Sequence, residues 1–154
     1  MKRAVFFLFL TALFFPPHAR AFYSDEISAS PDEVWRGVEK AMKPYGIRKS
    51  DFKKRRSESD WKEDQYVKSG KGLLHSIGSS VVRRRYRFQV RLEENSFKTL
   101  VKIKGSFQEK PLDVPPGILW KPVKPDTDDL ELERNFFMKI LAELESLRRV
   151  SVRN

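Results

Sequence analysis

The sequence contains no cysteine among its 154 residues. Disulfide bonds, thiolate metal sites, a cysteine nucleophile and a lipid-modified N-terminal cysteine are therefore excluded. Histidine is almost as scarce, and only His75 lies beyond the N-terminal segment. A single histidine is a poor metal site, so we interpret His75 as an ordinary loop residue. The sequence thus nominates no catalytic residue, no metal site and no cofactor, and we expect a protein that is not an enzyme.

A long hydrophobic run is also missing. The apolar run Ala4–Phe15 has twelve residues, whereas a membrane-spanning helix needs about 20. It follows Lys2 and Arg3 and precedes the small-x-small segment Ala19–Ala21, a pattern typical of a secretory signal peptide cleaved after Ala21. We therefore expect a signal peptide at residues 1–21 and one exported domain at residues 22–154. In a double-membraned bacterium this domain would be periplasmic, and any membrane association would be peripheral rather than integral.

Charge of one sign predominates instead. The chain has 31 basic and 21 acidic side chains, which gives a formal net charge of +10. Three of the basic residues lie in the expected signal, so the exported domain would keep a charge of +7. A strongly basic exported domain favours an anionic partner.

The first clear helix signal follows the segment YSDEISA, which we interpret as a short entering strand. Ser30 is placed to cap the helix, Pro31 suits its first position, and Glu33 can reach back to the cap. Pro44 and Gly46 then mark its end. The apolar residues in between recur on one face of the helix: Val34, Trp35, Val38 and Met42.

Two short strands are predicted on either side of a basic turn at Lys53 and Lys54. The alternation in the second strand places Ser57, Ser59 and Trp61 on one face. Residues 65–80 have no sustained period and contain three glycines, so we predict a loop there. We interpret the three tryptophans as core or core-edge residues, with Trp120 the one best placed to be an exposed contact.

A long antiparallel hairpin is predicted from VVRRRYRFQVRLEENSFKTLVKIKG, with a turn at EENS, because apolar and basic residues alternate with a period of two. One face would hold Val82, Tyr86, Phe88, Val90, Leu92, Phe97, Thr99, Val101, Ile103 and Phe107. The other face would hold seven cations: Arg83, Arg85, Arg87, Arg91, Lys98, Lys102 and Lys104.

A proline-rich crossover and a long amphipathic helix complete the chain. The helix is predicted to begin near Asp126–Asp128, where carboxylates suit the positive end of the helix dipole. This acidic run lacks the spacing and the glycine of a calcium loop. The apolar stripe of the helix consists of Phe136, Phe137, Ile140, Leu141, Leu144 and Leu147. The expected fold is therefore α+β: an antiparallel sheet of about five strands with two helices packed on one face.

Several segments resemble the BamC (NlpB)-like outer-membrane-assembly lipoproteins: ISASPDEVWRGVEKAMKPYGI, SESDW, RYRFQVRLEENSFKTLVKIKG and LWKPVKPDTDDLELERNFFMKILAEL. The resemblance implies a helix-grip domain and a role linked to outer-membrane biogenesis, at the outer membrane. The lipobox cysteine of that family is absent here. Through ISASPDEVW the chain also resembles, more loosely, START-like ligand-binding domains.

Two interpretations of the basic face remain open. It is either a solvated face whose cations pair with carboxylates such as Glu93 and Glu94, or a binding site for an anionic lipid surface or an envelope protein. Nucleic acid would satisfy the same electrostatics, but the signal peptide argues against it.

Two further hypotheses come from other classes of protein. In a small START-like carrier, Tyr86, Phe88, Val101 and Ile103 would line a cavity for an apolar ligand. In a purely structural subunit, a partner would dock on a free strand edge. The sequence gives neither that edge nor the oligomeric state.

Overall fold

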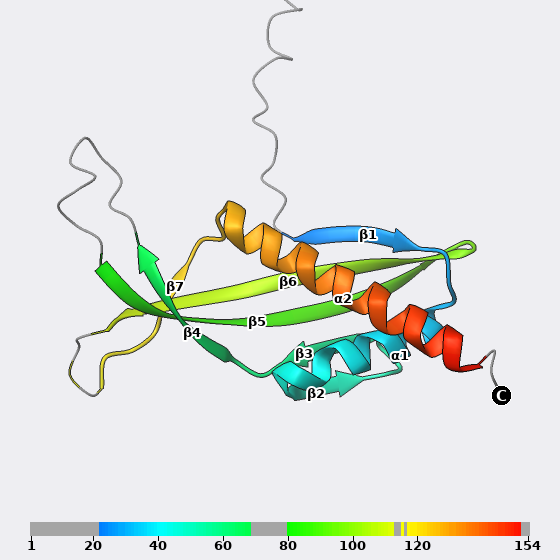
Figure 1. Cartoon of the computed structure of the whole chain (residues 1–154), viewed down its shortest axis with the longest axis horizontal. Coiled ribbons are helices and arrows are strands. Elements are labelled where there is room, and N and C mark those ends of the chain that lie inside the picture. Colours follow the sequence, from blue (N-terminus) through cyan, green and yellow to red (C-terminus); the bar gives the residue numbers. More distant parts are fainter. Residues whose placement is uncertain (1–21, 69–79, 113–114, 116, 152–154) are drawn as a thin grey trace, which may run out of the picture.

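The computed structural model describes residues 22–68, 80–112, 115 and 117–151. In this part of the chain, seven strands form one antiparallel sheet, and two helices pack against one of its faces (Figure 1). The predicted α+β class is thereby confirmed, with more strands than expected. The expected signal peptide, His75 and most of the predicted loop lie outside the described residues.

A long hairpin forms the centre of the sheet. Strand β5 (Ser80–Asn95) pairs with strand β6 (Lys98–Pro111) from Val82↔Pro111 to Asn95↔Lys98. Ser96 makes the turn with a positive φ of 52°. Phe97, expected on the apolar face, lies instead in this turn and is 96% exposed, because the strands continue pairing through the predicted EENS turn.

Shorter strands flank the hairpin on both sides. Two of them pair with β6: β1 (Tyr23–Ile27) and β7 (Lys121–Val123). Two others pair with β5: β3 (Arg56–Ser59) and β4 (Lys62–Lys68). Strand β2 (Ile47–Asp51) pairs with β3. β1 and the pair β2–β3 were predicted, whereas β4 and β7 were not.

A bulge separates β3 from β4. Glu58 lies opposite Gln89 and Lys62 opposite Tyr86, so three residues on one strand face two on its neighbour. Ser59 accepts the Phe88 amide at 2.9 Å through its hydroxyl oxygen. The extra residue reverses which face each later side chain occupies. Trp61 therefore lies on the opposite face from Ser57 and Ser59, and the predicted three-residue alternation is wrong at that point.

Helix α1 (Pro31–Met42) begins as the sequence predicts. The Ser30 hydroxyl accepts the Glu33 amide at 3.3 Å, and Pro31 occupies the first turn. The Glu33 carboxylate does not return to the cap; it accepts a hydrogen bond at 2.7 Å from Arg148 near the end of the second helix. The chain leaves α1 through the short 3-10 helix η1 (Lys43–Tyr45) and Gly46, whose φ is 76°.

Helix α2 (Thr127–Ser151) crosses the sheet beside α1 (Figure 1). Its start is a reciprocal cap, in which the Asp129 amide donates to the Asp126 carboxylate at 3.1 Å and the Asp126 amide donates to the Asp129 carboxylate at 3.0 Å. These bonds satisfy amide groups that the first helical turn otherwise leaves without partners.

The core lies between the helices and the sheet. The Phe88 ring of β5 stacks on the Phe136 ring of α2 with centroids 4.5 Å apart, and Tyr45 packs edge-on against both. The predicted apolar residues of α1 are all buried, as are four of the six predicted in α2: Phe136, Phe137, Ile140 and Leu144. The helices thus cover one face of the sheet and leave the other open.

Candidate anion-binding surface

The face of the sheet opposite the helices, called the far face below, carries the predicted cations. On β5 the buried residues Phe88, Val90 and Leu92 face the helices, so Arg87 and Arg91 face away. In the register, Arg91 lies opposite Lys102, and Gln89 lies opposite Lys104. By this alternation all seven cations predicted as the site lie on the far face: Arg83, Arg85, Arg87, Arg91, Lys98, Lys102 and Lys104.

Four of the seven pair with carboxylates. Arg87 binds Glu58 across the β3–β5 boundary. Arg91 and Lys102 share Glu93 at 3.2 and 2.6 Å. The hydrogen bond from Lys102 holds the pKa of Glu93 below its ordinary value. Lys98 binds Glu26 of β1 at 3.1 Å.

Arg85 is held differently, by aromatic rings. Its guanidinium carbon lies 4.6 Å from the centre of the Trp61 ring and 4.5 Å from the centre of the Trp120 ring. Its Nε and Nη2 atoms donate to the Gln108 side-chain oxygen at 2.9 and 2.6 Å. Burial lowers the pKa of Arg85 from its ordinary value. Such contacts fix the guanidinium in one orientation.

The two indoles extend this arrangement into a row. Arg87 contacts the Trp61 ring at 4.6 Å, and Lys110 contacts the Trp120 ring at 4.6 Å. Cations and indoles therefore follow one another as Arg87, Trp61, Arg85, Trp120 and Lys110, which we call the cation–indole row. The sequence favoured core or core-edge positions for the three tryptophans, with Trp120 the one best placed to be an exposed contact. Only Trp35 is in the core, at 3% exposure; the β3–β4 bulge and the crossover bring the other two onto the far face.

A shallow groove crosses the far face from β2 to β6, with a volume of about 790 Å³. Arg56 lies opposite Arg91, which lies opposite Lys102, so three cations occupy one row across three strands. Like charges placed directly opposite destabilise a sheet. The charged residues lining the groove are Lys49, Lys54, Arg56, Arg91, Lys102 and Lys104, against Asp51 and Glu58.

The sequence interpretation missed one arginine on the other face. Arg84 points toward α2 and is 6% exposed, and its Nη2 atom lies 2.6 Å from the Asp129 carboxylate. Glu109 of β6 lies 3.7 Å from its Nε atom. Burial raises the pKa of Asp129 above its ordinary value. The sequence pattern could have indicated that both residues are buried. Arg84 occupies an apolar position in the alternation of β5, and Asp129 lies in line with the apolar stripe of α2.

Glu133, one helical turn further along, was also missed. It is 1% exposed, and its two carboxylate oxygens accept the Gly105 amide at 2.6 Å and the Tyr23 amide at 2.7 Å. Desolvation raises its pKa above the ordinary value, although these two hydrogen bonds oppose that shift. Arg84, Asp129 and Glu133 therefore join α2 to the sheet and leave the far face free for another role.

The residues proposed to line a carrier cavity pack against the helices instead. Phe88, Val101 and Ile103 are at most 1% exposed and belong to one cluster with both helices, and Tyr86 packs partly buried at its edge. These side chains therefore belong to the packed core between the sheet and the helices.

Within the described ranges, no three side chains of the metal-binding types gather at one place. Neither described helix is both long and apolar enough to span a bilayer.

No protein-family model matches the sequence, and no curated protein matches it. Some solved structures are similar to this chain. One is a DUF4468 family protein from Bacteroides ovatus, with a TM-score of 0.49 and 11% identity over 80% of this chain and 85% of that chain. Another is a TBP-like protein from Parabacteroides distasonis, with a TM-score of 0.47 and 14% identity over 84% of this chain and 96% of that chain. The similarity to these two proteins concerns structure and says nothing of ligands. The resemblance to BamC-like lipoproteins stays a prediction from the sequence.

Proposed function

We propose that the protein is an exported, non-enzymatic cell-envelope module that binds an anionic partner with the far face of its sheet. The observation that carries this proposal is an excess of cations without carboxylate partners on that face. Five of them make no ion pair with any other described residue: Lys49, Arg56, Arg83, Lys104 and Lys110.

The arrangement of these cations favours binding over a merely solvated face. Arg83 lies directly opposite Lys110, and Arg56 lies directly opposite Arg91 on one side and Asp51 on the other. The pairings Arg83–Lys110 and Arg56–Arg91 place like charges on neighbouring strands at a cost in stability. An anionic partner would relieve this repulsion, and each basic group near an anionic surface contributes on the order of 1 kcal/mol to binding.

The proposed compartment is the envelope, because the N-terminal residues have the pattern of a secretory signal. The BamC-like segments support a role linked to outer-membrane biogenesis on the periplasmic side. We propose no contact with nucleic acid, since exported proteins seldom meet it. The alternative, a small START-like carrier, has less support because Phe88 and Ile103 already fill the space that a ligand would need.

The test measures binding to dextran sulfate, a generic soluble polyanion, over a series of salt concentrations. The chain from Phe22 to Asn154 is suitable because it contains every described element. We expect salt-sensitive binding that the double variant Arg56→Glu/Lys104→Glu weakens about tenfold or more, since 1.4 kcal/mol corresponds to a factor of ten.

The matched control is Arg36→Glu/Arg134→Glu. Both arginines are exposed, lie on the helices and make no ion pair with the other described residues. This control changes the net charge equally but leaves the far face intact, so it should retain most of the binding. An equal loss in both double variants would mean that only net charge matters and would refute the assignment to the far face.

A further inference from the structure

We infer that one end of the far face, around the connection between β6 and β7, docks on an anionic lipid bilayer with Leu119 inserted among the lipids. This inference rests on the proposed function and names the partner. The surface, called the loop patch below, consists of Ile118, Leu119 and Trp120 with the cations Arg83 and Lys110.

Exposed aliphatic side chains are the first part of the argument. Leu119 is 82% exposed and its neighbour Ile118 is 43% exposed. They follow Gly117, whose φ of 104° turns the backbone. A Cβ atom at Gly117 would have no neighbour within 4 Å, so open space surrounds this glycine. Adjacent large apolar side chains that project from an otherwise polar surface mark an interaction site.

The surrounding charge is the second part. Arg83 and Lys110 lie opposite one another without an ion pair to any described residue. Lys121 is also exposed, but it lies opposite Glu109 and therefore on the helix side of the sheet. Glu63, opposite Arg85 in the register, offsets one charge at this end of the sheet. The loop patch is therefore apolar at its tip and basic around it. In a bilayer, the apolar tip would enter among the acyl chains and the basic residues would bind the anionic headgroups.

Trp120 adjoins both the exposed aliphatic pair and the cations. Its ring contacts both Arg85 and Lys110 at about the same distance, 4.5 and 4.6 Å. Tryptophan is enriched at the boundary between headgroups and acyl chains because its ring is amphipathic. Held by two cations, Trp120 fixes the depth at which the neighbouring Leu119 can enter.

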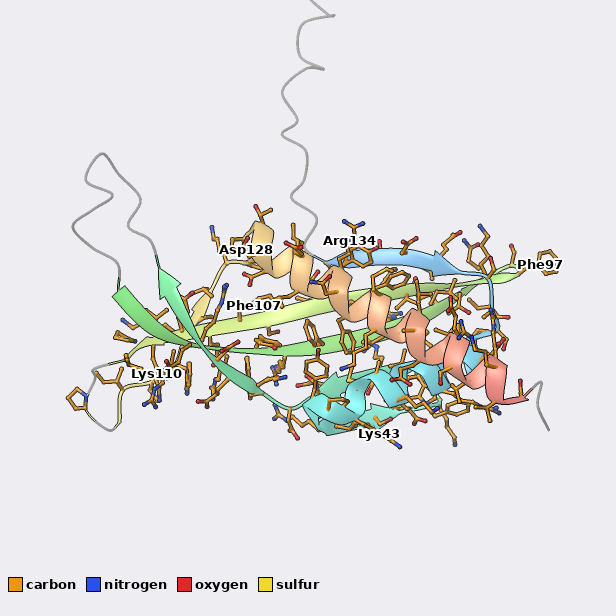
Figure 2. The ribbon with its side chains drawn as sticks, viewed as in Figure 1. Lys43, Phe97, Phe107, Lys110, Asp128 and Arg134 are labelled. Carbon is orange, nitrogen blue, oxygen red and sulfur yellow. The ribbon has the colours of Figure 1, made fainter. Side chains whose placement is uncertain are left out.

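The shape of the protein favours a bilayer at this end. The groove near Arg56 is a shallow concave part of the far face, whereas the loop patch lies at an end of the long hairpin. Lys110 marks this end and Phe97 marks the opposite one (Figure 2). A hydrophilic polymer would satisfy the cations but would leave Ile118 and Leu119 in water; a bilayer satisfies both.

The test is co-sedimentation of the chain from Phe22 to Asn154 with vesicles. One set contains phosphatidylcholine alone and the other contains phosphatidylcholine with phosphatidylglycerol, each over a salt series. We expect binding to the anionic vesicles only, and at least a tenfold weaker vesicle affinity for Ile118→Ser/Leu119→Ser. Because both side chains are exposed, this variant should keep its fold, which circular dichroism checks.

Phe97→Ser is the matched control, because Phe97 is an even more exposed apolar residue at the other end of the hairpin. It should bind anionic vesicles like the unchanged protein. Equal binding by Ile118→Ser/Leu119→Ser and the unchanged protein would overturn the inference, as would a loss confined to Phe97→Ser.

Dextran sulfate separates the inference from the proposed function. Retention on dextran sulfate without binding to anionic vesicles would overturn the lipid assignment, leave the far-face proposal standing and point to an acidic polymer or protein. Failure to bind either probe would overturn both.

Discussion

Arg84 of β5 and Asp129 of α2 form a buried ion pair with 2.6 Å between Nη2 and the carboxylate oxygen, although 45 residues separate them in the chain. Asp129 is fully buried, and the same carboxylate also caps its own helix through the Asp126 amide. One side chain thus fixes both where α2 begins and where it meets the sheet.

Replacing Arg84 should therefore be costly. Arg84→Ala would leave the Asp129 carboxylate buried without its cation, and removal of one partner from a buried pair costs about 3–5 kcal/mol of unfolding free energy. Urea unfolding measures this loss. Arg83→Ala, at the exposed neighbouring position, should change the free energy by less than about 0.5 kcal/mol. Similar losses in the two variants would show that the ion pair does not anchor α2.

The raised pKa of Glu133 predicts that its contribution to the free energy of unfolding increases as the pH falls. Burial raises its pKa in the folded protein above the ordinary value of 4.5, so the folded state binds a proton at pH values where the unfolded state does not. The contribution of Glu133 to stability is therefore largest below the unfolded pKa and falls as pH rises through the folded pKa. The free energy of unfolding, measured relative to Glu133→Gln, should increase when the pH is lowered from 7 to 5. A decrease over that interval would contradict the raised pKa.

Gly105 allows β6 to pass beneath Glu133. A Cβ atom at this position would lie 2.4 Å from the Phe107 ring and 3.0 Å from a Glu133 carboxylate oxygen. The Phe107 ring is buried at 3% exposure and cannot move aside freely. Gly105→Ala should destabilise the protein by about 1–3 kcal/mol, the usual range for an overpacked core. Ser106→Ala, on the far face, is the control, and a thermal melt that shifts equally for both would remove this explanation.

The cation–indole row predicts graded effects at Trp61. Trp61→Ala removes a ring that contacts both Arg85 and Arg87 and should cost about 1–2 kcal/mol of unfolding free energy, since each partly exposed cation–π contact contributes about 0.5–1 kcal/mol. Trp61→Phe keeps a ring and should lose less. In a double-mutant cycle with Arg85→Ala, the two changes should be non-additive by several tenths of a kcal/mol. Additive losses would mean that the ring and the guanidinium do not interact.

The sequence predicts the fold wherever one face of an element is uniformly apolar. Strands β5 and β6 were predicted because their two-residue period is nearly unbroken, and α1 because Ser30 and Pro31 mark its start. Strand β4 could not be predicted: KEDQYVK has little preference for extended structure and becomes a strand by pairing with β5, a tertiary effect.

The sequence predicts which face of the sheet carries the candidate site, but not which of its cations pair with carboxylates. Alternation places the seven cations on one face, yet it treats Arg87, which binds Glu58, and Arg83, which makes no ion pair with the described residues, as equivalent. It also cannot detect the extra residue between β3 and β4 that moves Trp61 to the far face. Pairings between distant segments carry this information, and a local period does not contain it.

The arrangement of short strands around the central hairpin has a consequence for solubility. β5 and β6 are 16 and 14 residues long and alternate apolar with basic residues over much of that length, and exposed edges of such strands would recruit other chains into aggregates. On their outer sides, β5 pairs with β4 and β3 over residues 80–86 and 89–91, and β6 pairs with β1 and β7 over residues 99–103 and 107–109, so only short stretches of either strand lack a second neighbour. The free edges belong to β1, β2, β4 and β7, which have at most seven residues each. Charges in β2 and β4 and Pro122 in β7 hinder these edges from pairing with strands of another chain. The short edge strands thus protect the long strands β5 and β6 from aggregation in a protein that has no disulfide bonds.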